Sequence, residues 1–412
     1  MMTLEELKTE YSGALYSYFR ITNLKESYEK FIKDPGKPPA FKYSPSTSLE
    51  IVNERIEKLH AILENLDPAN AAEVAFVEWR IAESLLLKEF RKIYEKNHKI
   101  TPKIIDKYIA DQEELYGAMD QSVFGGIIRY IRITSHRRGQ EYRKVMANIE
   151  KKIGDHFDYH LYTPKEAAFQ HYKRLLPECF PELYKSLSAI RGADHYSKLD
   201  IMDTFERSLQ AVGAAKAGWG VDLTDGGANI IAAKYRKKIL VGRDFQPTST
   251  LRFKQIVAHE VGCHVQRAIT DRHDKTQAEF DENDEGLAIV LEQLLASRFM
   301  YKRVIRYLAI CLALGMDGKK RDFCETYDIL WRATYIIGGD KKKAKEQAFY
   351  ETARTFRGGL PFIPGMVYIK DKIYLESNLL VWEKLEEKML DKDHFRKMFR
   401  GHDSLLAKEI VP

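Results

Sequence analysis

Apolar residues recur at three- and four-residue spacing from Ser48 to about Lys96, which is the period of a helix with one buried face. The pair Asp67-Pro68 interrupts this pattern, and proline at such a point separates two helices. A helical hairpin is therefore predicted. Similar periodicity continues along the chain, so we expect residues 1–190 to form a mainly helical N-terminal region.

The pattern of residues along the chain changes after residue 191. Apolar residues flank a basic turn, Lys234 to Lys238, and this predicts two short strands within residues 229–242. Thr248 to Thr250 can then cap a helix that runs through Val265. Residues 356–375 are rich in Gly, Pro and aromatic side chains, so we expect a loop with strands before a final helix from Leu379. These elements predict an α+β fold that is predominantly helical, with a small antiparallel sheet in a second region, residues 191–412.

Composition narrows the class of protein. Hydrophobic residues make up 44% of the 412 and charged residues 31%, which excludes collagen-like, low-complexity and wholly disordered chains. The longest nearly apolar run, Tyr307 to Met316, is about half of the ~20 residues that a membrane-spanning helix needs. The net charge of +6 comes from basic residues interleaved with acidic ones, so no specific nucleic-acid partner is expected.

The N-terminus and the cysteines indicate the compartment, which we expect to be the cytoplasm. Residues 1–7 are acidic and lack the basic and apolar regions of a secretory signal. The four cysteines form no CxxC pair, and we expect reduced thiols. No membrane association is predicted.

The segment His259-Glu260-Val261-Gly262-Cys263-His264 carries the chemistry. Two imidazoles beside a carboxylate are the parts of a catalytic zinc site. In a regular helix, however, residues five apart lie about 140° from each other around the axis. One solution is a local π-bulge, helped by Gly262, which brings His264 to the same ion. The other is a regular helix in which Cys263 is the ligand, and a non-catalytic alternative is two buried, hydrogen-bonded histidines.

A catalytic zinc site usually has three protein ligands, so a third is expected elsewhere. Glu285 lies 21 residues after His264, close to the predicted start of an apolar helix. A carboxylate that faces the zinc helix from a second helix is the gluzincin arrangement. The other acidic residues of this segment are expected to complement the helix dipole; they are Asp281, Glu282 and Asp284. His273 competes with Glu285 but lies in a polar loop.

His-Glu-Val-Gly-Cys-His together with Asp-Glu-Gly-Leu-Ala resembles the microtubule-associated tyrosine carboxypeptidase family. The family pattern is HExxxH followed by EGLA, with late Arg-x-x-Arg-Gly and Lys-Asp-x-x-Tyr-Leu segments. This chain carries the late segments at residues 354–358 and 370–375, and the similarity runs from about Tyr18 to Trp382. We expect one of the bacterial relatives of the family. Asp284, where the family often has Gln or Ser, and Glu376, which replaces a frequent Gly, depart from the pattern.

The resemblance implies a gluzincin-like zinc metallopeptidase core in which His259, His264 and Glu285 bind Zn²⁺ and Glu260 is the catalytic base. The implied activity is hydrolysis of the C-terminal residue, tyrosine or another bulky or acidic residue, from a peptide or protein. Among eukaryotic members of the family the known activity is removal of the C-terminal tyrosine of tubulin.

Two further roles need residues outside the zinc ligands. Tyr374 is the candidate donor that steadies the oxyanion, although a packed aromatic in a strand is the alternative. An exopeptidase must also recognise a free carboxylate, for which guanidinium groups are best suited. Arg354, Arg357 and Lys370 are the candidates, and ordinary salt bridging is the alternative for each.

Two other functions are compatible with the sequence. One is a zinc peptidase of different specificity, of dipeptidyl peptidase or endopeptidase type. The other is a non-catalytic binding protein, either stapled by zinc or using a basic helical scaffold such as residues 129–143. The intact Glu260 favours catalysis, because a structural zinc site has four protein ligands and needs no base.

Overall fold

The computed structural model describes residues 19–44, 48–96, 100–154, 156–157, 159–192, 195–225, 229–270 and 277–401. These residues form two compact units, and each unit combines segments that are distant in sequence. Among the described residues, one unit contains 163–302 and 373–401, and the other contains 19–162 and 303–372. The predicted division of the chain into a helical N-terminal region, residues 1–190, and a catalytic region, residues 191–412, stays a prediction.

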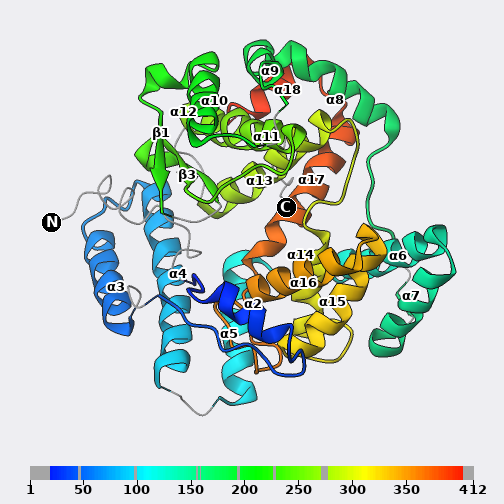
Figure 1. Cartoon of the computed structure of the whole chain (residues 1–412). Helices are drawn as coiled ribbons and strands as arrows, with labels where there is room; N and C mark the ends of the chain where they lie inside the picture. The colour runs from blue at the N-terminus through cyan, green and yellow to red at the C-terminus, as the bar shows by residue number, and fades with distance from the viewer. Residues whose placement is uncertain are drawn as a thin grey trace. The chain divides into compact units, whose positions relative to one another are not determined.

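The unit that contains the early residues is helical throughout its named elements (Figure 1). They are α2 (Leu24–Phe31), α3 (Leu49–Leu63), α4 (Ala71–Lys96), α5 (Pro102–Tyr116), α6 (Gln121–Arg138), α7 (Gln140–Ile153), α14 (Val304–Leu314), α15 (Phe323–Gly338), α16 (Lys341–Thr355) and the 3₁₀ turn η6 (Lys370–Lys372). Helices α3 and α4 pack against each other, which confirms the predicted hairpin. No helix in the described part of the chain is both long enough and apolar enough to cross a membrane.

The other unit combines helices with a small sheet (Figure 1). Its elements are α8 (Glu166–Cys179), α9 (Pro181–Ser188), α10 (Lys198–Ala211), η3 (Ala214–Ala217), β1 (Gly220–Thr224), β2 (Ile230–Ala233), η4 (Lys234–Arg236), β3 (Lys238–Gly242), α11 (Thr250–Val257), η5 (Ala258–Val265), α12 (Gln266–Thr270), α13 (Gln277–Leu295), α17 (Ile373–Lys388) and α18 (Lys392–Met398). Helix α13 is almost wholly apolar from Leu287 to Leu291 and is buried there. It packs against both η5 and α17.

The sheet is mixed rather than antiparallel, and this corrects the sequence prediction. Its strand order is β1-β3-β2, so β3 is central and β2 is an edge strand. The predicted hairpin around the basic turn is present as the antiparallel pair of β2 and β3. Strand β1 pairs with β3 in parallel. It follows a glycine-rich stretch with little alternation, so only the long-range pairing with β3 identifies it as a strand.

The segment before the last helices also differs from the prediction. The structure has no strand between residues 356 and 375, and α17 begins at Ile373, six residues earlier than expected. The aromatic and β-branched residues that suggested strands are instead buried in loop and helix. Tyr374 therefore lies in the first turn of a helix that packs on α13.

Gly286 allows α13 and α17 to approach closely, directly beside Glu285. A Cβ atom at Gly286 would lie 2.6 Å from the backbone oxygen of Ser377 and 2.9 Å from Val381 Cγ2. We expect Gly286→Ala to lower the free energy of unfolding by about 1–3 kcal/mol, because the backbone must shift to relieve the overlap. Urea titration measures the loss. Gly338→Ala is the matched control, since no atom lies within 4 Å of its added Cβ, and equal stability losses in both variants would contradict the packing argument.

Candidate metal centre

The predicted distortion of the histidine helix is present. Residues 258–265 form the π-helix η5, which continues α11 and leads into α12. A π-helix bonds residues five apart, so His259 and His264 share one face. Gly262 lies where α9 and α13 close on this turn, and a Cβ there would lie 2.7 Å from Leu183 Cδ2 and 3.2 Å from Leu291 Cδ1.

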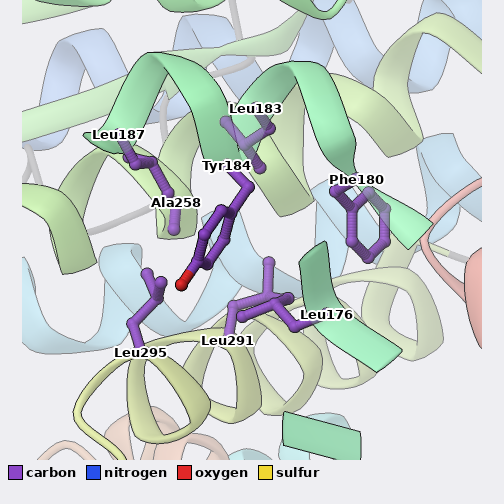
Figure 2. Close-up of a pocket in the computed structure, with 8 residues that line it drawn as sticks. All are labelled: Leu176, Phe180, Leu183, Tyr184, Leu187, Ala258, Leu291 and Leu295. Carbon is purple, nitrogen blue, oxygen red and sulfur yellow. The ribbon is translucent and has the colours of Figure 1, made fainter. Parts of the chain in front are cut away.

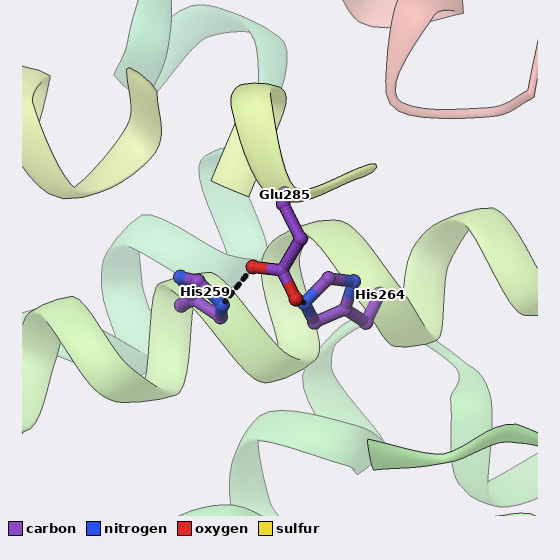
Figure 3. A group of neighbouring side chains, drawn as sticks. All are labelled: His259, His264 and Glu285. Carbon is purple, nitrogen blue, oxygen red and sulfur yellow. Dashed lines mark ion pairs between the residues drawn. The ribbon is translucent and has the colours of Figure 1, made fainter. Parts of the chain in front are cut away.

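The three predicted ligands converge in the structure. One ligand atom each from His259, His264 and Glu285 lie within 4.8 Å of one another. Glu285 Oε2 is 3.4 Å from His259 Nε2, and Glu285 Oε1 is 3.9 Å from His264 Nε2. Figure 3 shows the carboxylate of Glu285 placed between the two rings. Because α13 begins at Gln277, Glu285 lies well inside the helix and not near its start as expected.

Cys263 is not one of the clustered donor residues. Its Sγ donates a hydrogen bond to the backbone oxygen of Asp284, with 3.3 Å between the two atoms. Burial raises the pKa of the thiol well above its usual value, which disfavours the thiolate that a metal requires. The geometry thus gathers His264 and not Cys263 with the other donors.

The donor set suits a divalent cation. Two imidazoles and one carboxylate are the ligands of a catalytic zinc site with a position left for water or substrate. Glu285 Oε2 is buried and makes no hydrogen bond to the described residues. Burying such an oxygen without a partner costs free energy, which a bound cation or a hydrogen-bond donor would offset. Burial lowers the pKa of His259, but the neighbouring carboxylates of Glu285 and Glu292 outweigh this and raise the pKa to about 10. The surrounding carboxylates therefore favour positive charge at this point, which a bound cation would supply in place of the ring proton.

Glu260 is held beside the ligands by the sheet. Its Oε2 accepts a hydrogen bond from the backbone N–H of Ala232 on β2, with 3.0 Å between the two atoms. Burial raises the pKa of Glu260 above its usual value. A carboxylate with a raised pKa is better matched to proton transfer near neutral pH.

The edge of β2 lies along this carboxylate. Asn229 and Gly242 form a hydrogen-bonded pair, through a bond of 2.8 Å from the Gly242 N–H to the Asn229 carbonyl. Hydrogen-bonded pairs alternate in an antiparallel ladder, so Ile230 and Ala232 direct their N–H and C=O groups away from β3. Backbone groups of an edge strand therefore face the side on which Glu260 lies.

A second carboxylate from α13 supports the first histidine. Glu292 Oε1 lies 2.9 Å from His259 Nδ1, on the opposite side of the ring from Glu285. Glu292 also pairs with Arg252 at 2.5 Å and Lys302 at 3.1 Å. Burial opposes its ionisation, but His259 and Arg252 outweigh this and lower the pKa of Glu292. The sequence signal that could have identified it is a lone charge in an apolar run, two helical turns after Glu285.

Asp284 does not serve the helix dipole as expected. It lies in the interior of α13, is 0% exposed and forms ion pairs with Arg267 and, at 2.7 Å, with Lys234. Burial opposes its ionisation, but the Lys234 and Arg267 charges hold the pKa of Asp284 well below its usual range. Its Oδ2 is 3.6 Å from His264 Nδ1. Sequence analysis missed this role because none of the three partners is close to Asp284 along the chain.

The predicted substrate-binding residues lie in the other compact unit. Arg354 Nε and Arg357 Nη2 donate to the carboxylate of Asp371, at 2.5 and 2.9 Å. Lys370 Nζ lies 3.3 Å from Glu83 Oε1. Arg354 and Arg357 thus share one buried carboxylate, while Lys370 has a different partner.

Tyr374 belongs to the same compact unit as the metal centre and is half-buried in α17. His273 lies outside the described residues, and so do the side chains of Asp281 and Glu282.

An apolar pocket lies beside η5 and α13. Figure 2 shows its lining side chains, which come from α8, α9, η5 and α13 and include Ala258, Leu183 and Leu291. The Tyr184 phenol is the only titratable group that lines it. The pocket therefore offers apolar packing surface and no group for hydrolysis.

The sequence profile of the microtubule-associated tyrosine carboxypeptidase family matches residues 156–406. The chain belongs to this family. The match confirms the resemblance inferred from the two motifs, and it covers η5, α13 and the late Arg-x-x-Arg-Gly segment. No curated protein and no solved structure matched the chain. The family is named for a carboxypeptidase, which indicates a peptidase that acts on a peptide or protein.

Proposed function

We propose that this protein is a zinc-dependent metallocarboxypeptidase that removes the C-terminal residue, tyrosine or another bulky or acidic residue, from a peptide or protein. His259, His264 and Glu285 hold Zn²⁺ in a gluzincin-like core. The observation that carries the proposal is the convergence of these three donors beside a buried Glu260. The cytoplasm remains our proposed compartment, because no disulfide joins any two of the four cysteines, all of which lie in the described residues.

Different residues of the chain carry out different steps of hydrolysis. Bound Zn²⁺ supplies Lewis acidity, which activates water and polarises the scissile carbonyl. Glu260 accepts the proton from the attacking water and delivers one to the leaving amine. Because Oε2 is held by Ala232, Oε1 is the oxygen that exchanges the proton. Tyr374 is assigned as the second donor to the oxyanion, and its place in a helix that packs on α13 supports this assignment.

The substrate is recognised through its backbone and its terminal carboxylate. At the edge of β2, the backbone N–H and C=O groups of Ile230 and Ala232 point away from β3. This edge suits an extended peptide that adds to the sheet beside Glu260. Arg354, Arg357 and Lys370 are proposed to recognise the free carboxylate. Arg354 and Arg357 are both paired with Asp371, and Arg354 keeps 31% of its side chain exposed, which makes it the member of this pair that a substrate carboxylate can reach.

Paired peptides with free and amidated C-termini test the proposal. The zinc-loaded protein is expected to release single C-terminal residues from the free peptides and to leave the amidated ones intact, as read from product masses. Removal of zinc by a chelator should abolish the release, and added zinc should restore it. Cleavage of the amidated peptides, or release of dipeptides, would reject the carboxypeptidase assignment in favour of another zinc peptidase.

A further inference from the structure

Each imidazole of the metal centre has a carboxylate of α13 behind it. The Nε2 atoms of His259 and His264 face Glu285, and their Nδ1 atoms face Glu292 and Asp284 respectively. A histidine that binds a metal through one nitrogen carries its proton on the other, and an acceptor for that proton orients the ring. His264 Nδ1 makes no hydrogen bond to the described residues, and Asp284 Oδ2 lies 3.6 Å away from it.

Asp284 differs from Glu292 in what else it contacts. The oxygen that faces His264, Oδ2, is also 2.7 Å from Lys234 Nζ. Lys234 directly follows β2, the strand whose Ala232 N–H holds Glu260. The partners of Glu292 are Arg252 and Lys302, which lie on neither β2 nor its turn. Asp284 is thus bonded to the segment that positions the base, and Glu292 is not.

We propose that Asp284 is a positioning residue for two groups at once. It orients His264 so that Nε2 faces the ion, and through Lys234 it holds β2 at the distance at which Ala232 can bind Glu260. Arg267, which is 0% exposed, balances the second oxygen of Asp284 and keeps the buried carboxylate charged. This inference rests on the proposed zinc peptidase function. In this inference Asp284 sets the position of both a metal ligand, His264, and the catalytic base, Glu260.

Substitutions at the two ends of the Lys234–Asp284 pair separate these roles. Asp284→Asn should weaken zinc binding by about 10–100-fold, the usual effect of losing a group that orients a ligand, and should also lower kcat at saturating zinc. Lys234→Met should leave zinc affinity within about 3-fold of wild type yet lower kcat by about 10-fold or more, with KM little changed. Lys234→Arg, which keeps the positive charge, should recover part of the lost kcat. Zinc affinity is measured by competition with a chromophoric chelator, separately from peptide hydrolysis.

Lys238→Met is the matched control, because it removes a lysine four residues after Lys234, whose Nζ lies 3.2 Å from Asp222 Oδ1 on β1 and which is not paired with Asp284. It should change neither zinc affinity nor kcat. The proposal is overturned if Asp284→Asn binds zinc as wild type does, or if Lys234→Met keeps wild-type kcat. Should Asp284→Asn fail to fold, the Lys234 variants decide by themselves. A wild-type protein that binds no zinc would overturn the proposed function as well, whereas normal zinc binding with unaffected variants overturns this inference alone.

Discussion

Glu260→Gln is expected to retain a full equivalent of zinc and to lose hydrolysis by about 10²–10⁴-fold in kcat. The amide can still accept the hydrogen bond from Ala232, so the local structure is preserved, but it cannot take a proton from water. Metal analysis of the purified variant and the steady-state rate on a free-carboxyl peptide measure the two quantities. The combination is specific to a base, since loss of a ligand would reduce both.

Glu206→Gln, on an exposed position of α10, is the control for the same chemical change and should behave as wild type. Retained hydrolysis in the Glu260 variant would show that this carboxylate is not the base. Another group would then have to act as the base, whereas a wild-type protein that binds zinc but hydrolyses no peptide would favour the non-catalytic, zinc-stapled alternative.

His264→Ala is expected to weaken zinc binding by more than about 100-fold, beyond the usual effect of losing a group that only orients a ligand. Cys263→Ala should bind zinc as wild type does, because the thiol donates to the Asp284 carbonyl and lies outside the ligand cluster. Chelator competition measures both affinities. The two residues are adjacent, so each variant controls for local disturbance caused by the other.

The opposite pattern, with zinc kept after His264→Ala and lost after Cys263→Ala, would show that the helix adopts a regular form around the metal. The ligand at this position would then be the sulfur. The π-helical geometry of η5 is therefore tested together with the ligand assignment.

Several structural features could be predicted because they depend on neighbouring residues. Five-residue spacing between His259 and His264 cannot serve one ion from a regular helix, so a π-turn was one of the two predicted solutions, and the structure contains it. The hairpin of α3 and α4 followed from periodicity, and that of β2 and β3 from the basic turn between apolar segments. Glu285 was identified by its place after an acidic segment and by the family pattern.

The features that could not be predicted depend on distant partners. Strand β1 has its hydrogen-bond partner in β3, and the parallel register exists only after the chain folds back. The start of α17 at Ile373 depends on packing against α13, which overrides the β-preference of its first residues. Asp284 looked like a solvated acid, and only its burial against Arg267 and Lys234 makes it an ion-paired group.

By itself, then, the sequence predicted the helical character of the chain and, with the family motifs, a distorted histidine turn and a candidate set of donors, because spacing along a helix decides which side chains share a face. The tertiary structure decided which of those side chains have charged neighbours. Buried carboxylates must find cations or hydrogen-bond donors wherever packing brings them, and in this protein the partners of Asp284 and Glu292 come from elements remote in sequence. The support of the metal centre, unlike its ligands, is therefore a property of the fold.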